Sequence, residues 1–283
     1  MIAIDRLVKL AISLAFALKD KLAQTLSGRA RQPGTCVVIN YHTISDDSKS
    51  RFGRQLDMLV HLAMPIQADK EFRLEKGQRY VAITVDDVFE SFVVNGLPQL
   101  CGRNIPVTLF PPTGYLGRPS IWKDYGGPNK VGESVVSADD LKKIARLDNV
   151  HFGSHGVAHA DLVTLSEDET RHELKGSKTS LESIVARKIT ALSFPYGSYG
   201  VRELRLAREA GYKFLFDSTP QQLVSNLGEG LIGRVDVQTT DWNIEFKLKV
   251  CGAYRWVRRA SAWKRRVSSW FVKSPAMKEL KHA

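Results

Sequence analysis

The sequence predicts an α/β fold, a distorted (β/α) barrel of about seven parallel strands with helical extensions at both ends. Short, β-branched apolar runs alternate with helical segments along the chain, which is typical of parallel strands joined by right-handed crossovers. About seven such runs occur within the 283 residues. That number favours a barrel over an open sheet.

Each predicted strand is a short apolar run bounded by turn residues. The first, residues 35–41, follows Pro33-Gly34 and indicates a buried strand. The remaining runs are residues 80–85, 107–110, 150–153, 191–194, 213–217 and 231–237.

Three of the intervening helices carry start or stop signals. Ser137 begins one helix, and Ser166 begins a long one with Glu169 in the capping-box position. A third helix over 201–210 ends at Gly211, a residue suited to a left-handed helix stop.

We expect three parts: a helix within residues 1–33, a main domain over 34–245 and a tail over 246–283. The first part is apolar, but charged residues interrupt it, and its uninterrupted run over 10–18 is too short to span a bilayer. No small-residue cleavage site follows that run. An amphipathic or docking helix is therefore favoured, with an uncleaved signal-anchor as the alternative.

The positive charge is concentrated in the tail. The chain has 41 Lys and Arg against 30 Asp and Glu, and residues 247–283 hold eleven of the basic residues with a single acid, Glu279. A nearly neutral main domain argues against a nucleic-acid-binding fold. The three cysteines are widely separated, which favours a reducing compartment. We expect a cytoplasmic protein at the periphery of the inner membrane.

Two local patterns indicate chemistry. His155 and His159 are four residues apart, so both reach one metal ion if the segment turns helically after the preceding strand; a polar turn is the alternative. Asp86 and Asp87 follow another strand, where barrels build their active sites, and a solvated turn is the alternative there. Both patterns belong to strand ends on one face of the predicted barrel.

At these positions the chain resembles the polysaccharide deacetylases that carry the NodB homology domain. The family motif T-[FV]-D-D-x-x-x-S is similar to residues 84–91, and S-H-[ST]-x-x-H-x-x-L is similar to residues 154–162. A third motif ends in P-Y-G, here Pro195–Gly197. The motifs occur in the family's order, and the resemblance covers roughly residues 35–240. It is closer to the permuted branch that includes the poly-N-acetylglucosamine deacetylases.

The resemblance implies that Asp87, His155 and His159 bind a divalent metal ion, commonly zinc. Such a centre lowers the pKa of bound water towards about 7 and polarises the acetamide carbonyl. Asp86 would be the base that takes the proton of this water, and the backbone N–H of Tyr196 would help hold the oxyanion. The implied activity is removal of an N-acetyl group from an amino sugar of a glycan or glycolipid.

The chain departs from the family pattern at several positions. Val88 stands where the first motif has glycine, and Gly156 where the second has serine or threonine. The arginine that opens the third motif and orients the base is missing, with Ser193 in its neighbourhood. Arg234, on a later predicted strand, is a substitute; an ordinary surface arginine is the alternative.

The family's late catalytic histidine is also missing, because only His282 follows His172. His42, directly after the first predicted strand, belongs to a Tyr-His-x-Ile pattern similar to that of the permuted branch. We predict that His42 is the acid that protonates the leaving amine. The alternative is a strand-end histidine bonded to the backbone.

Substrate contacts are predicted for Pro195, Tyr196, Arg234 and Trp242. Trp242 is included because Asp241-Trp242 loosely matches a further family motif. The alternative to the enzyme is a catalytically decayed protein that binds carbohydrate or serves as a membrane-associated scaffold.

The tail suggests where the enzyme works. Trp256, Trp263 and Trp270 recur every seven residues among basic residues. A helix of this composition would lie on an anionic membrane surface, whereas packing on the barrel and binding of a polyanion are the alternatives.

Overall fold

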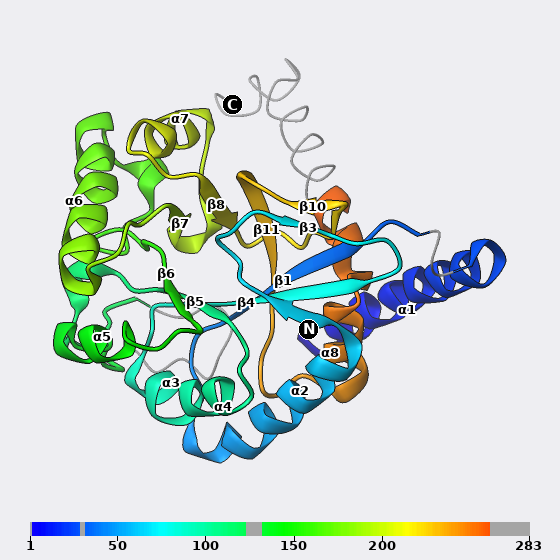
Figure 1. Ribbon diagram of the computed structural model, residues 1–283. Coiled ribbons are helices and arrows are strands. Elements are labelled where there is room, and N and C mark those ends of the chain that lie inside the picture. The colour runs from blue at the N-terminus through cyan, green and yellow to red at the C-terminus, as the bar shows by residue number, and fades with distance from the viewer. Residues whose placement is uncertain (1, 29–31, 123–131, 261–283) are drawn as a thin grey trace, which may run out of the picture.

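Seven parallel strands form a nearly closed barrel in the computed structural model, which describes residues 2–28, 32–122 and 132–260 (Figure 1). The strands are hydrogen-bonded in the order β6-β5-β4-β1-β11-β8-β7. When β6 and β7 are joined to close the ring, this is the order in which the strands occur along the chain. Its two edges meet through Ser154, which donates its N–H to the carbonyl of Ala191 and accepts from Ser193. The barrel strands are β1 (Thr35–Tyr41), β4 (Arg79–Asp86), β5 (Val107–Phe110), β6 (Val150–Phe152), β7 (Ala191–Ser193), β8 (Phe214–Asp217) and β11 (Gly230–Asp236).

The predicted barrel is therefore confirmed, with strand ends that differ from the expected ones by at most one residue. Short strands supplement it: β2 (Met64–Ile66) pairs with β4, β9 (Leu223–Val224) pairs with β1, and β3 (Phe72–Arg73) pairs with β10 (Asn226–Leu227). The helices that surround the strands are α2 (Lys49–Leu62), α3 (Glu90–Asn95), α4 (Leu97–Gly102), α5 (Ala138–Ile144), α6 (Glu167–Val185) and α7 (Val201–Glu209). Single 3-10 turns span Asp46–Ser48, Thr113–Tyr115, Leu162–Thr164, Pro195–Gly197 and Ala253–Arg255.

Strand alternation divides the core into two layers. On β1, Cys36 and Val38 pack inside the barrel, whereas Val37 and Ile39 pack between the barrel and the helices. This period of two means that the polar residues further along the same strands also point inward at regular positions.

Local signals explain the helix ends. The predicted capping box between Ser166 and Glu169 is present at the start of α6, with both of its hydrogen bonds formed. Gly211, at φ +85°, follows the end of α7 in the left-handed region, as expected of a helix stop.

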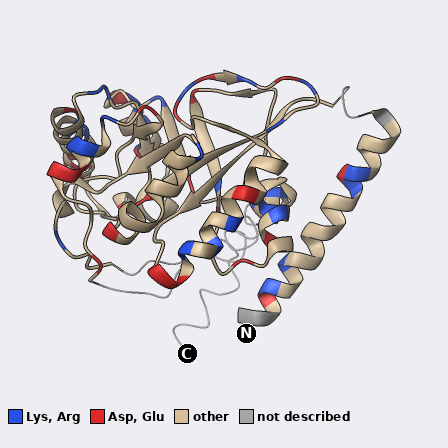
Figure 2. Ribbon diagram, turned by 60° about the horizontal axis from the view of Figure 1, so that its bottom comes forward, with Lys and Arg blue, Asp and Glu red and all other residues tan. Residues whose placement is uncertain are grey.

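The N-terminal helix α1 (Ile2–Ser27) lies beside α8 (Asn243–Val250) (Figures 1 and 2). Arg6 bonds to Glu245, and Arg255 bonds to Asp20 through two hydrogen bonds of 2.8 and 2.7 Å. Among the residues that the structure describes, no helix combines the length and hydropathy required for a membrane span.

The basic tail does not begin as a separate segment. Helix α8 continues across residue 246, and the Lys249 ammonium bonds to Asp241 at 2.7 Å. The indole of the half-buried Trp256 donates to Ser13 Oγ at 3.0 Å, so this tryptophan contacts helix α1. Trp263 and Trp270 lie outside the described residues.

Candidate metal centre

A polar layer occupies the carboxyl ends of the barrel strands. Its members continue the inward-facing positions of β1, β4, β7 and β11 beyond the apolar core, and each is at most 4% exposed. They are Asn40, Thr84, Asp86, Ser193 and Arg234. This end of a (β/α) barrel is where catalytic residues from different strands meet.

Asp87, His155 and His159 converge beside this layer. One ligand atom from each lies within 4.8 Å of the other two, and Asp87 Oδ1 is 3.8 Å from His155 Nε2 and 3.3 Å from His159 Nε2. All three residues are buried. The sequence prediction that these side chains come together is thus confirmed.

The donor atoms fit a divalent metal ion. Asp87 Oδ1 is buried and has no hydrogen-bond partner within the described chain. His155 Nδ1 lies 2.9 Å from the carbonyl oxygen of Ser193, and an N–H donated there leaves the lone pair of Nε2 facing Asp87. Trp122 Nε1 donates to Asp87 Oδ2 at 3.1 Å, which leaves Oδ1 available. Two imidazole nitrogens and a carboxylate oxygen form a ligand set that divalent transition metals accept.

The electrostatics of the centre keep one histidine neutral and able to bind a metal ion. Burial, followed by the charge of His155, lowers the pKa of His159 to about 2. Its imidazole is therefore neutral near pH 7, which is the state that ligates metal. Burial also raises the pKa of Asp87 to about 6. A bound cation would favour the ionised form of this carboxylate.

The loop that carries both histidines is not helical, contrary to the expectation behind the four-residue spacing. Gly156 adopts φ +76° and His159 φ +52°. Glu173 of α6 accepts the backbone N–H groups of Val157 and Ala158, at 2.8 and 2.9 Å, and so holds the loop. A Cβ at Gly156 would lie 2.9 Å from Glu173 Oε2, which accounts for glycine at this motif position.

A left-handed turn aims the two adjacent aspartates in different directions. Asp87 and Val88 have φ values of +62° and +53°, and the N–H of Val88 bonds to the carbonyl of Asp86 at 2.7 Å. The substitution of valine for the motif glycine therefore preserves a left-handed turn, and the Val88 side chain is fully buried. Asp86 consequently enters the barrel while Asp87 faces the histidines.

Arg234 is the partner of Asp86. It is fully buried, so the surface-arginine alternative is wrong. Its Nη1 and Nη2 atoms donate to Asp86 Oδ1 and Oδ2 at 2.7 and 2.6 Å. Burial acts to raise the pKa of Asp86, but the charges of Arg234, His155 and His42 outweigh it and hold that pKa well below its usual range. Asp86 is therefore a carboxylate at neutral pH.

The comparisons with known proteins agree with this site. The profile of the polysaccharide deacetylase family matches residues 73–215, half of the chain, and that range includes both aspartates and both histidines of the centre. The chain belongs to the polysaccharide deacetylase family. It is a hydrolase that acts on carbon–nitrogen bonds, and its buried Asp-His-His cluster is a metal-binding triad.

Relatives of this deacetylase are distant. YxkH of Bacillus subtilis (strain 168) is 22% identical over 220 residues, which cover 74% of each chain. A poly-beta-1,6-N-acetyl-D-glucosamine N-deacetylase of Staphylococcus aureus (strain MSSA476) is 25% identical over 204 residues, which cover 66% of each chain.

Solved structures share the fold of this deacetylase. IcaB from Ammonifex degensii matches with a TM-score of 0.63 at 20% identity, covering 79% of this chain and 98% of its own. The Streptococcus pyogenes deacetylase PplD, solved with acetate, gives a TM-score of 0.59 at 20% identity, covering 74% of this chain and 95% of its own.

Of the other predicted site residues, His42, Pro195 and Tyr196 lie near the metal centre, whereas Trp242 lies against helix α1. His42 directly follows β1, and its charge is among those that lower the pKa of Asp86 after the larger effects of burial and Arg234. The Tyr196 ring contacts the His159 ring edge-on at 4.7 Å, and buried Pro195 belongs to the same turn. Trp242 instead lies against α1, with the guanidinium of Arg6 4.4 Å above its ring.

Arg234 was also predicted to contact substrate, and its burial corrects this. A side chain with no exposed surface, bonded to Asp86 and flanked by the rings of Phe110 and Phe216, acts on substrate only through Asp86. Its predicted alternative role, orientation of the base in place of the missing motif arginine, agrees with these bonds.

Sequence reasoning missed three residues of the site. The Trp122 ring stacks on His159 with centroids 4.2 Å apart, and Asn40 donates to Asp86 Oδ2 at 3.2 Å. Asp236 follows Arg234 at the next inward position of β11, and its side chain is exposed at the mouth of the barrel. Asn40 carried a signal, a polar residue within an apolar strand, whereas Trp122 carried none.

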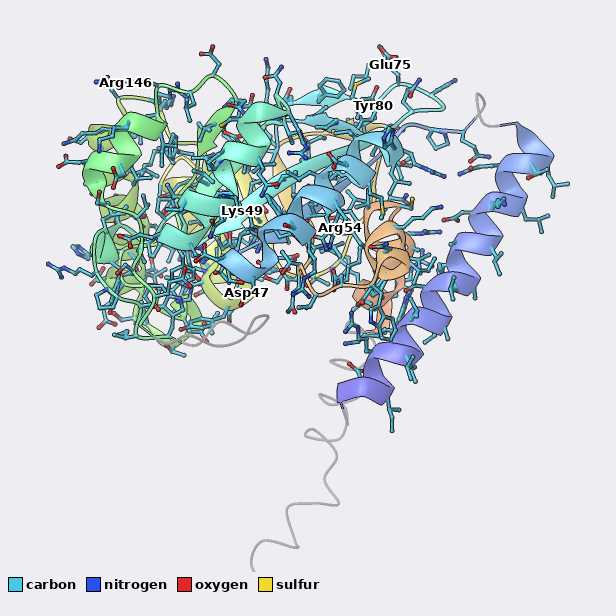
Figure 3. The ribbon with its side chains drawn as sticks, turned by 90° about the horizontal axis from the view of Figure 1, so that it is seen from below. Asp47, Lys49, Arg54, Glu75, Tyr80 and Arg146 are labelled. Carbon is cyan, nitrogen blue, oxygen red and sulfur yellow. The ribbon has the colours of Figure 1, made fainter. Side chains whose placement is uncertain are left out.

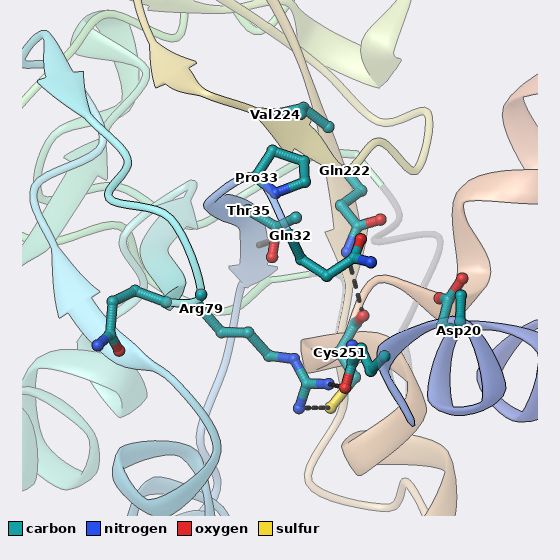
Figure 4. Close-up of a pocket in the computed structure, with 12 residues that line it drawn as sticks. Asp20, Gln32, Pro33, Thr35, Arg79, Gln222, Val224 and Cys251 are labelled. Atoms are coloured by element: carbon teal, nitrogen blue, oxygen red, sulfur yellow. Dashed lines mark hydrogen bonds between the residues drawn. The ribbon is translucent and has the colours of Figure 1, made fainter. Parts of the chain in front are cut away.

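A cavity of about 190 Å³ lies at the opposite end of the barrel, where β1 and β4 begin (Figure 4). Arg79 donates to Cys251 Sγ at 3.9 Å and to Gln24 Oε1 at 3.3 Å within it. The cavity lies between α1 and the barrel, and no residue of the metal centre lines it.

Proposed function

We propose that this deacetylase removes the N-acetyl group of an amino sugar in a polysaccharide or a lipid-linked glycan, with zinc as its metal ion. The supporting observation is the position of an ionised carboxylate, Asp86, beside the triad of Asp87, His155 and His159. A divalent ion held by this triad would supply the positive charge that acidifies water and polarises the amide carbonyl. The staphylococcal relative, described as acting on poly-N-acetyl-glucosamine, supports the class of substrate.

Asp86 is the proton acceptor in this proposal. Its Oδ2 atom accepts from Arg234, Ser193 and Asn40, whereas Oδ1 accepts, within the described part of the chain, a single hydrogen bond from Arg234 at 2.7 Å. Oδ1 therefore keeps acceptor capacity for the proton of an attacking water. The low pKa of Asp86 makes it a weak base, which suffices when that water is acidified.

His42 is the proton donor to the leaving amine. It lies at the end of β1, next to the strand that carries Asp86, so it reaches the same mouth of the barrel. Imidazole donates a proton near neutral pH, and the collapse of the tetrahedral intermediate requires such a donor because an amide anion is a poor leaving group. The Tyr196 backbone, at φ +60° beside His159, would hold the oxyanion.

The test measures metal content and acetate release on the same preparations. The wild-type protein is expected to hold about one zinc ion per chain and to release acetate from N-acetylglucosamine oligomers. His155→Ala should lose the metal, whereas Asp86→Asn and His42→Gln should keep it and lose about 10²- to 10⁴-fold in rate. Asp139→Asn, an exposed acid on α5, is the matched control and should change neither quantity.

Each assignment has its own contradicting result. A wild-type protein that neither binds metal nor releases acetate from any N-acetylated oligomer contradicts the proposed function. Full activity of His42→Gln contradicts only the assignment of the acid. Loss of metal in Asp86→Asn contradicts the separation of the base from the metal ligands.

A further inference from the structure

The outer face of α1 is an apolar surface that is interrupted, near its C-terminal end, by the exposed Thr25. Seven large apolar side chains of this helix are at least 38% exposed, and the outer face projects away from the barrel (Figures 2 and 3). We call this set the α1 stripe; its members are Ile4, Leu7, Val8, Leu14, Leu18, Leu22 and Leu26. From first to last they span about 33 Å at the rise of an α-helix.

The opposite face of α1 is bound to the protein by polar contacts. Ser13 accepts the indole N–H of Trp256, and Asp20 accepts two bonds from Arg255. Leu10 and Ala17 pack with the small apolar cluster of α8 and the following turn. These contacts fix which side of the helix faces outward, so the exposure of the α1 stripe is a property of the folded chain.

The width and the borders of the stripe indicate what covers it. At about 100° per residue, the stripe and the exposed Ala11 and Ala15 occupy about 120° of the helix circumference. A two-helix coiled coil uses a narrower seam, flanked by charges of both signs. Here the exposed residues Lys19 and Lys21 lie on the two margins, where lysine side chains reach up to lipid headgroups.

Charge complementarity points to an anionic lipid surface. Residues 247–283 carry eleven Lys and Arg and one acid. Lys249 and Arg255 are paired with Asp241 and Asp20 within the protein, so the excess of positive charge comes from the other basic residues. The segment begins in α8, against the inner face of α1. A wide apolar stripe with lysines on both margins, in a chain whose C-terminal segment is strongly basic in sequence, is the pattern of helices that lie in a membrane interface. We propose that the α1 stripe docks this protein on the surface of a bilayer that contains anionic phospholipids.

The placement of α1 sets the consequence for the enzyme. Arg6 donates to the carbonyl of Thr240, just beyond the carboxyl end of β11, whereas Gln24 accepts from Arg79 at the start of β4. The helix therefore runs beside the barrel from the catalytic mouth to the opposite end. A bilayer against the α1 stripe lies next to that mouth, within reach of a glycan attached to lipid.

The test is flotation of the full-length protein with vesicles of phosphatidylcholine, with and without phosphatidylglycerol. The protein should float with the anionic vesicles, and less at high salt. Replacing Leu7, Leu14 and Leu18 together by serine should lower the partition coefficient by about tenfold or more, because three leucines leave the interface.

A matched control replaces three exposed valines on other elements, Val94, Val163 and Val201, by serine, and should float like the wild-type protein. Circular dichroism and acetate release from a soluble oligomer check that both variants are folded, and neither readout depends on lipid. Flotation that is equal in the leucine variant and the wild type overturns the proposal. So does a wild-type dimer that the leucine variant makes monomeric, because the α1 stripe would then be a contact between two copies.

Discussion

Replacement of Arg234 by methionine tests whether the buried ion pair organises the site. The guanidinium is fully buried, and it donates hydrogen bonds to both oxygens of Asp86 and to the hydroxyl oxygen of Ser193. Its central carbon lies 5.7 and 5.8 Å from the ring centroids of Phe110 and Phe216. Methionine fills much of this space with apolar atoms, so the change is mainly electrostatic.

The expected loss of stability follows from the state of Asp86 after the change. A buried carboxylate that loses its only cationic partner in the polar layer costs about 3–5 kcal/mol of unfolding free energy. Replacing Asp86 by asparagine in the same protein removes that unpaired charge, and the loss should shrink to about 1–2 kcal/mol. The double variant should therefore be about 2–3 kcal/mol more stable than Arg234→Met alone.

The assay is urea unfolding followed by circular dichroism, with a chelator present so that bound metal adds nothing to the stability of the folded state. Arg234→Lys should retain part of the stability, since it keeps the charge and loses the paired geometry. An Arg234→Met loss below about 1 kcal/mol, or a double variant as unstable as Arg234→Met alone, would refute the claim that Asp86 is ionised and held by Arg234.

Three further predictions concern the surroundings of the centre. Trp122→Phe keeps the ring stacking but removes the N–H donated to Asp87, so zinc affinity in a chelator competition should fall about 10- to 100-fold; an unchanged affinity contradicts this role. Gly156→Ala, at φ +76°, should lose about 1–2 kcal/mol in urea unfolding, whereas Gly102→Ala, with open space around its Cβ, should lose nothing. Burial raises the pKa of the Cys36 thiol to about 12. The contribution of the neutral thiol to the free energy of unfolding is therefore complete below about pH 9 and is lost as the pH rises towards 12. Alkylation of Cys36 at pH 8 should require unfolding.

The barrel and the metal triad were predictable because their signals are local. The long helix α6 begins with a capping box between Ser166 and Glu169 that reads directly from four consecutive residues. Asp87 and His155 follow strands at the same end of a parallel barrel, so their convergence follows from topology alone. Helix geometry was not needed for it, and the loop at Gly156 shows that the four-residue spacing was the weaker argument.

The ion pairs that the basic residues near the C-terminus form could not be predicted from net charge alone. Lys249 and Arg255 counted as part of a positive tail, yet they bond to Asp241 and Asp20 within the folded protein. Asp20 and Arg255 are 235 positions apart, and no local pattern links them. Net charge by segment measures which residues are present, whereas the field at the surface depends on which of them are neutralised by distant partners.

Arg234 shows why a missing motif residue does not by itself indicate a lost activity. The electrostatic requirement at Asp86 is a guanidinium at one point in space, and inward-facing residues of several strands reach the central axis of a barrel at the same height. Ser193 of β7 stands close to the position where the family motif has arginine, and it bonds to Asp86 at 3.1 Å and to Arg234 at 2.8 Å. The small serine leaves space inside the barrel, and Arg234 of β11 fills that space. In the sequence, the arginine of the family motif is missing. In the folded barrel, Arg234 supplies the cationic partner of Asp86 from another strand. The interpretation of a decayed enzyme therefore loses one of the departures that support it.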